Sequence, residues 1–204
     1  MCVEAPQIAD IVARFKGIRT RTGGAGVMEG SPRPLVIKNL LRVLDIDKRL
    51  YGNTALIPCS QRDLSPWVKR LNPPLPFNLL AMAAPHLRSQ APGDQFSDDT
   101  VKDLFNTLYA GFTCARQNTA QGKACIIHSG KLGCGVFNNN PLLVLLLHVY
   151  ISHVLNVQVV MHGYTREEWE EGQRVFGSCS QALLRAPTLE RGVEIIANAC
   201  RPRS

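Results

Sequence analysis

The sequence contains no C-x-x-C pair, although seven of its 204 residues are cysteines. An odd number of cysteines cannot close into a complete set of disulfides, and isolated cysteines do not match common zinc-binding or redox motifs. Reduced thiols are typical of proteins inside cells. We therefore expect an intracellular protein, with the cytoplasm favoured and the nucleus or delivery into a host cell left open.

The sequence also has no segment that we interpret as a secretory signal or a membrane span. Residues 1–15 are acidic and polar before any apolar stretch begins, which does not fit a signal peptide. The most apolar segment, residues 141–160, is interrupted by two histidines, an asparagine and a glutamine. Such a segment predicts a buried helix followed by a strand, and no membrane partner.

Aromatic residues are few, at 6%, and the formal net charge is +7. A positive charge favours phosphate-bearing or acidic partners. The basic residues are scattered, however, and no stripe of alternating basic and aromatic residues accompanies them, so nucleic acid is an unlikely partner. His148 and His153 are five residues apart and do not share a helix face at metal-binding spacing. We expect no metal and no cofactor, and no oligomeric state follows from the sequence.

Two stretches are rich in glycine, at residues 23–27 (GGAGV) and 129–137 (SGKLGCGVF). Each follows a candidate strand and precedes a candidate helix. Bare backbone at such a place allows close approach of a ligand. The N–H groups at a helix N-terminus favour an anion such as a phosphate. The alternative interpretation, a plain turn between strand and helix, is less favoured because two such stretches are present.

The hydrophobic pattern predicts alternating strands and helices over much of the chain. Residues 65–76 are too rich in proline to predict a long regular element. We expect helices at 34–52, 97–122, 141–155 and 165–184, and strands at 53–60, 77–85, 123–129 and 157–164. This order predicts an α/β domain with a largely parallel sheet covered by helices.

The order of these motifs resembles the macrodomain fold that binds ADP-ribose, most closely its poly(ADP-ribose) glycohydrolase branch. The segments that carry the resemblance are GGAGV, LPFNLLAMAAPHL, a long helix, ACIIHSGKLGCGVFNNNP and VQVVMHGY, within residues 10–176. The resemblance implies a three-layer sandwich, with a mixed, largely parallel sheet and helices on both faces. It also implies a single domain over residues 1–204, which we expect to lack N-terminal strands of that fold.

In macrodomains, two glycine loops clamp the diphosphate and the distal ribose of ADP-ribose. Phe137 would form a wall of the ribose pocket, and Tyr164 corresponds to a residue that stacks on adenine. The resemblance therefore implies ligand contacts at Gly23, Gly24, Ala25, Gly26, Val27, Ser129, Gly130, Gly133, Cys134, Gly135, Val136, Phe137 and Tyr164. We interpret Cys134 as a small residue of the loop, since no base is paired with it.

The sequence departs from the family where catalysis is concerned. Met28 stands where the mono-ADP-ribose hydrolase branch carries an aspartate, and no adjacent glutamate pair follows this first loop as it does in the glycohydrolase branch. Glu29 is the candidate catalytic residue, because a carboxyl group can act as acid or base in glycoside cleavage. The glutamates of residues 165–176 fit a solvated helix start instead.

Three functions stay open at this stage. The favoured one is an ADP-ribosyl hydrolase that releases ADP-ribose from a modified macromolecule. Met28 favours the second, a reader that binds ADP-ribose without cleaving it. The third, nucleic-acid binding, rests on net charge alone.

Overall fold

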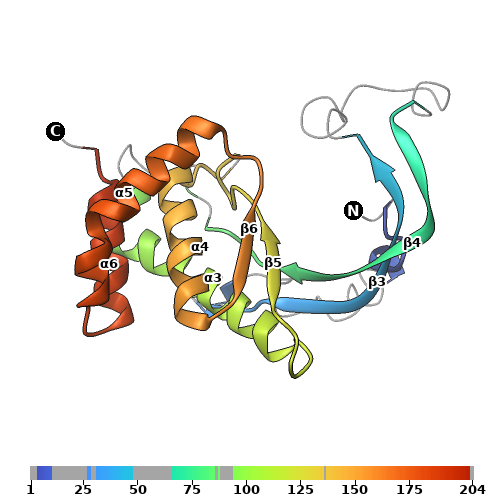
Figure 1. The fold of residues 1–204 in the computed structure, drawn as a ribbon, viewed down its shortest axis with the longest axis horizontal. Coiled ribbons are helices and arrows are strands. Elements are labelled where there is room, and N and C mark those ends of the chain that lie inside the picture. The colour runs from blue at the N-terminus through green and yellow to red at the C-terminus, as the bar shows by residue number, and fades with distance from the viewer. Residues whose placement is uncertain are drawn as a thin grey trace. The chain divides into compact units, whose positions relative to one another are not determined.

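The structure is a computed structural model that describes residues 4–10, 27–28, 31–47, 66–85, 87, 94–135 and 137–202. The chain forms two compact units. The first comprises residues 1–24 and 36–79, and the second comprises residues 25–35 and 80–204. Figure 1 labels β3 to β6 and α3 to α6.

The first unit is built on a long two-stranded ribbon of β3 (Leu35–Ile46) and β4 (Val68–Ala81). The first residue of β3 and the last two residues of β4 are assigned to the second unit. The strands run antiparallel: the Asp47 backbone N–H donates to the Trp67 carbonyl at 2.8 Å, and the Asn39 backbone N–H donates to Asn78 Oδ1 at 3.0 Å.

The predicted helix at 34–52 is therefore wrong over its described part, and so is the expectation of no long element at 65–76. The apolar spacing of residues 35–46 allows either a helix or a strand. Its β-branched residues favour extended backbone, and β4 supplies a pairing partner that no local pattern reveals.

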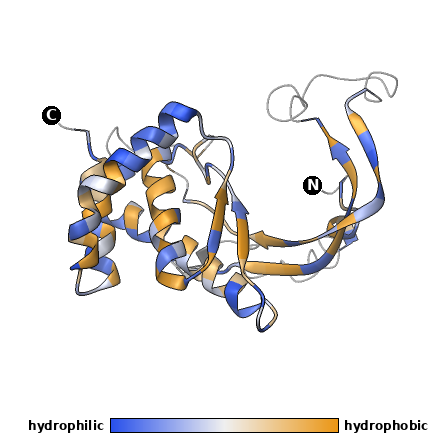
Figure 2. Ribbon diagram, in the orientation of Figure 1, coloured by the Kyte–Doolittle hydropathy of each residue, from blue (hydrophilic) through white to orange (hydrophobic). Residues whose placement is uncertain are grey.

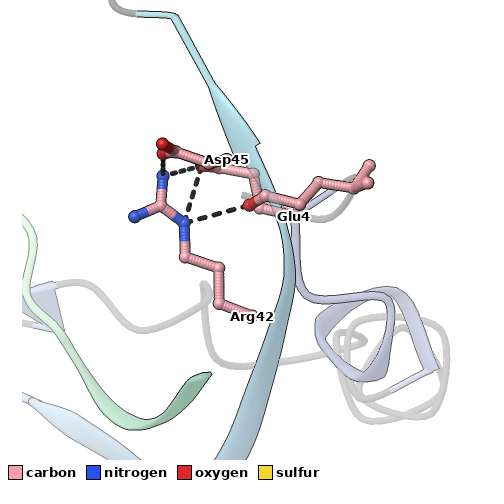
Figure 3. Close-up of polar contacts among 4 residues, drawn as sticks. Glu4, Arg42 and Asp45 are labelled. Carbon is pink, nitrogen blue, oxygen red and sulfur yellow. Dashed lines mark hydrogen bonds and ion pairs between the residues drawn. The ribbon is translucent and has the colours of Figure 1, made fainter. Parts of the chain in front are cut away.

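An ion pair and a small apolar cluster attach the N-terminal segment to β3. Ala5, Ile8 and Leu40 are buried together. Arg42 Nη2 lies 2.7 Å from Glu4 Oε1 and 2.8 Å from Asp45 Oδ1, as Figure 3 shows. Glu4 is only 7% exposed, so the guanidinium neutralises a carboxylate that has little access to water.

The second unit contains the helices and two further pairs of strands. Short β1 (Val27–Met28) pairs antiparallel with β2 (Ser31–Pro32), and β2 contacts α3 (Asp98–Gln117). After α3 the chain forms, in order, β5 (Ile126–Ser129), α4 (Pro141–Leu155), β6 (Gln158–Met161), α5 (Arg166–Leu184) and α6 (Leu189–Cys200). A 3₁₀ turn, η3 (Asp94–Phe96), precedes α3.

Helix α4 lies at the centre of the second unit, in contact with α3, α5, α6 and β6. Its apolar residues are buried on several faces, as expected for a helix packed on all sides, and Figure 2 shows it largely in the hydrophobic colour. The prediction of a buried helix followed by a strand is confirmed. No helix within the described part of the chain has the length and apolarity needed to cross a membrane.

The α/β class is confirmed, and helices or strands are found within the ranges expected from residue 77 onward; α6 was not predicted. Within the described residues each sheet has two strands, and β5 and β6 are the parallel pair. The extent of the larger sheet expected from the sequence, and the single domain over 1–204, stay predictions.

Candidate functional site

The C-terminal ends of β5 and β6 lie next to each other. The strands pair in parallel with Ile126 opposite Gln158 and Ser129 opposite Met161. The His162 backbone N–H then donates to the Ser129 carbonyl at 2.8 Å. In α/β sheets this edge is where ligands bind. The segment that follows β5, including the glycine loop (residues 129–137), therefore starts at the edge of the sheet expected to carry a site.

Two asparagines hold the end of this loop. Asn139 is 3% exposed, and its Nδ2 donates to the Pro85 carbonyl at 2.9 Å and to the Gly133 carbonyl at 3.2 Å. Asn140 is the N-cap of α4, and its Oδ1 accepts from the Leu143 backbone N–H at 3.0 Å. Asn140 therefore caps the helix, whereas Asn139 braces the loop itself.

The glycines of the loop differ in what surrounds them. Gly133 has φ +70°, and a Cβ there would clash with the Asn139 side chain and lie 2.6 Å from Ala84 Cβ. A Cβ at Gly130 would lie 3.2 Å from the His162 carbonyl oxygen. A Cβ at Gly135 would meet nothing within 4 Å. Protein atoms thus approach the first two glycines, whereas none of the described residues lies close to a Cβ added at Gly135.

Tyr164, which follows β6, contacts the segment between β5 and α4. Its hydroxyl donates to the Pro141 carbonyl at 3.2 Å, and the Lys131 ammonium lies 5.2 Å from its ring centroid. Lys131 Nζ also pairs with Glu168 Oε1 at 2.5 Å. The loop, the start of α4 and the start of α5 are therefore joined through these side chains.

Burial sets the protonation of the two titratable groups at the centre of this contact. It raises the pKa of the Cys134 thiol to about 11, although the nearby Lys131 ammonium opposes the shift. It also raises the pKa of the Tyr164 hydroxyl well above its usual range. Cys134 is a neutral thiol at neutral pH, which agrees with its interpretation as a small loop residue and not a nucleophile.

A buried histidine lies behind the first residue of the loop. His148, on α4, is 0% exposed; its Nε2 lies 2.8 Å from Ser129 Oγ and its Nδ1 lies 2.7 Å from the Val144 carbonyl oxygen. Burial lowers the pKa of His148 to about 4, so the ring is neutral at neutral pH.

The structure places only part of the predicted site. Ser129 ends β5, and the residues that follow it include Gly130, Gly133, Cys134, Gly135 and Phe137. Tyr164 contacts Lys131 and Pro141, and the Phe137 side chain is 37% exposed. Val27 lies in β1, opposite Pro32. The other predicted residues, Gly23, Gly24, Ala25, Gly26, Glu29 and Val136, lie outside the described residues.

Four polar side chains at this edge were not singled out from the sequence: His128, Lys131, His162 and Glu168. The rings of His128 and His162 stack with centroids 5.3 Å apart, and Nδ1 of His128 lies 3.0 Å from Nε2 of His162. The two histidines lie next to each other because β5 and β6 pair in this parallel register. Within the described ranges, no three histidine, cysteine or acidic side chains group so that they could hold a metal ion.

Glu168 differs from the other glutamates of α5. It completes a capping box with Thr165, and its second oxygen binds Lys131. Glu170 pairs with Arg166 and Glu171 pairs with Arg174 on the exposed side of the helix. The side chains of Glu170 and Glu171 are exposed to solvent, as predicted for the glutamates of residues 165–176. Glu168 instead contacts the glycine loop through Lys131.

Comparison with protein families matches residues 64–171 to poly(ADP-ribose) glycohydrolase (PARG), macro domain fold. The match covers more than half of the chain and includes β5, the glycine loop, α4, β6 and Tyr164. The domain is thus of the macrodomain class, which binds ADP-ribose or its polymer. The chain belongs to the poly(ADP-ribose) glycohydrolase family, as the resemblance implied. No curated protein matches the chain. Residues 23–29 precede the matched region.

Proposed function

We propose that this protein is an ADP-ribosyl hydrolase, which binds ADP-ribose at the glycine loop and releases it from a modified macromolecule. The observation that carries the proposal is the glycine loop at the carboxyl end of a parallel strand, leading into the N-terminus of α4 inside the region that matches the family. Backbone N–H groups and the helix dipole both favour a diphosphate at this place.

The proposed binding mode assigns each part of the ligand to a different group. The diphosphate lies along the loop near Gly135, where a side chain is absent and no atom of the described part of the chain lies within 4 Å of an added Cβ. Phe137 walls the distal ribose. Lys131 already lies over the Tyr164 ring, so we propose that adenine stacks on the opposite face. The proposed fold is a three-layer macrodomain sandwich. In it the clamp on the ligand is completed by Gly23, Gly24, Ala25, Gly26, Val27 and Val136.

Catalysis is assigned to Glu29. Binding energy from the diphosphate would hold the distal ribose strained toward an oxocarbenium-like state, and the carboxyl group would protonate the departing group or orient the attacking water. The second candidate, a reader that does not cleave, is favoured by Met28 at the position of the aspartate. We further propose that the protein acts inside cells, on an ADP-ribosylated macromolecule and not on nucleic acid as such.

The binding claim is tested by calorimetry with ADP-ribose and AMP. We expect ADP-ribose to bind far more tightly, because AMP leaves N–H donors of the loop unpaired. Gly135→Val places a side chain where the diphosphate is proposed to lie and should weaken ADP-ribose binding by on the order of 2 kcal/mol. Gly177→Val is the matched control, since a Cβ there also meets nothing within 4 Å, but on α5. Equal affinity for both ligands, or normal binding by Gly135→Val, contradicts the proposal.

The catalytic claim is tested by incubating the protein with mono- and poly-ADP-ribosylated substrates. Glu29→Gln keeps the side-chain shape but removes the ionisable proton. We expect turnover to fall roughly a hundredfold or more while the Kd for ADP-ribose stays unchanged. Wild-type turnover by this variant would move catalysis to another residue, with the acids of residues 167–171 next. Binding without release from any substrate would establish the reader.

A further inference from the structure

His148 is a polar residue in an otherwise apolar environment. The neighbouring α4 residues Leu145, Leu146 and Leu147 are buried, and the His148 ring meets the edge of Phe112 with centroids 5.5 Å apart at 74°. An aliphatic side chain would fill this position without bringing a polar group into the core. The two hydrogen bonds of the ring are therefore what distinguishes histidine here.

The partners of the ring determine its tautomer. The Val144 carbonyl oxygen can only accept a hydrogen bond, so Nδ1 of His148 carries the proton and donates it across 2.7 Å. In a neutral ring, Nε2 is then an acceptor. Ser129 must donate its hydroxyl proton to Nε2 across 2.8 Å.

This bond fixes Ser129 from a second direction. Its carbonyl already accepts from the His162 backbone N–H, and its backbone pairs with Met161 of β6. With the hydroxyl bound to α4 as well, the first residue of the glycine loop is tied to both the end of β6 and α4. The hydroxyl oxygen has given its only proton and keeps only acceptor lone pairs for any other partner.

We propose that His148 is a positioning residue, which fixes the Ser129 hydroxyl and with it the start of the glycine loop, and which leaves Ser129 able only to accept a hydrogen bond from a ligand hydroxyl or N–H group. This inference rests on the proposed function for the identity of the ligand. The tautomer and the ordering of the loop do not depend on the ligand. Failure of the two proposals can therefore be distinguished.

The first test is a long-range ¹H–¹⁵N correlation spectrum of the imidazoles in the wild-type protein at pH 7. We expect one histidine with the neutral ring protonated at Nδ1, and its signals should disappear in His148→Gln. Protonation at Nε2, or an imidazolium, would overturn the proposal whether or not ADP-ribose binds.

The second test compares variants that keep different parts of the ring's bonding. A glutamine amide at position 148 can reach the Ser129 hydroxyl, whereas the shorter asparagine can replace only the donor to Val144. We expect His148→Asn and Ser129→Ala each to weaken ADP-ribose binding at least tenfold, and His148→Gln to stay within about threefold of wild type. The double variant Ser129→Ala/His148→Asn should bind no more weakly than the worse single variant, because both remove one interaction.

His153→Phe is the matched control, since His153 is an exposed histidine on the same helix. Amide hydrogen exchange at Gly130 and Lys131 should speed up in His148→Asn and not in His148→Gln or His153→Phe. Equal affinity and equal exchange in the Asn and Gln variants would overturn the proposal. If the wild-type protein does not bind ADP-ribose, the proposed function fails, and the exchange experiment still decides the positioning role.

Discussion

At the scale of single residues, His148 links stability to pH. Its folded-state pKa of about 4 lies below the ordinary value of 6.5, because burial disfavours the charged ring. Between these values the unfolded chain binds more protons than the folded one. The contribution of His148 is therefore fully present above pH 6.5 and is lost as the pH falls toward 4, by about 3 kcal/mol in total.

This prediction is checked by urea unfolding from pH 7.5 to 4.5. Carboxyl groups contribute to the loss of stability in every variant, so the comparison with His148→Gln isolates the imidazole. Between pH 7.5 and 4.5, we expect the free energy of unfolding to fall by about 2–3 kcal/mol less in His148→Gln than in the wild type. His153→Phe should show the wild-type dependence on pH. Parallel profiles for wild type and the Gln variant would contradict a buried, neutral His148.

The glycines show what single residues in the sequence could and could not predict. A ligand contact is predicted at Gly133, and the protein atoms that lie closest to an added Cβ there belong to Asn139 and Ala84. Ala84 is far from Gly133 in the sequence, so no local pattern could identify it as the neighbour. Close approach to the backbone is found at Gly130 and Gly133, and the ligand contacts expected of the loop stay predictions.

At the scale of elements, the pair of Arg42 and Glu4 attaches the N-terminal segment to β3. Arg42→Leu would leave the Glu4 carboxylate buried without this cation. We expect a loss of about 1–2 kcal/mol in the free energy of unfolding of this unit, below the value for a fully buried pair because Arg42 is partly exposed. Hydrogen exchange at the Val43 amide, which donates to the Glu4 carbonyl, reports this unit directly.

Asp45→Asn serves as the control for that prediction. Asp45 also binds Arg42, but its side chain is 56% exposed, and exposed pairs contribute little. We expect its effect to stay within about 0.5 kcal/mol. If Arg42→Leu and Asp45→Asn lower the free energy of unfolding equally, the burial of Glu4 does not explain the contribution of its pair with Arg42.

Helices were predicted well where residues typical of a helix start mark their first turn. Ser97 caps α3, Pro141 opens α4 and Thr165 caps α5, and each of these helices was predicted. β3 was not, since its apolar spacing fits two structures and the pairing with β4 decides between them. The stacked His128 and His162 depend on the register of two strands, which hydrophobic pattern alone does not determine.

At the scale of the whole molecule, the net charge of +7 distinguishes two kinds of ligand. ADP-ribose has two phosphates, and the proposed loop meets them with uncharged N–H groups. We expect its affinity to fall by about tenfold or less between 50 and 200 mM salt, whereas a protein that neutralises many nucleic-acid phosphates loses far more. Titration of ADP-ribose and of single-stranded DNA at both salt concentrations makes the comparison. A steep loss for ADP-ribose, with DNA bound more tightly, would favour nucleic-acid binding.

The sequence predicted the family of the molecule. It also predicted, for one of the two expected loops, the strand and the helix that flank it. The 129–137 loop lies between a strand and a capped helix that local pattern identifies. Within the 23–29 stretch the structure describes only β1, which pairs with β2 and does not lead into a described helix, so the role of this stretch rests on the resemblance alone. Its assignment therefore depends on the Glu29 and ADP-ribose experiments.

The core around α4 comes from one continuous stretch of the chain. Among the residues that the structure describes, the fully buried members of this cluster lie between Phe96 and Cys200, and earlier residues such as Leu80 and Met82 pack only at its margin. The helices and strands of this stretch thus pack mainly against one another, and β2 is an earlier element that also contacts α3. Evolution could accordingly inherit this core as one transferable piece, but the glycine loop would keep its shape only together with Ala84 and Pro85, which contact it from outside that stretch.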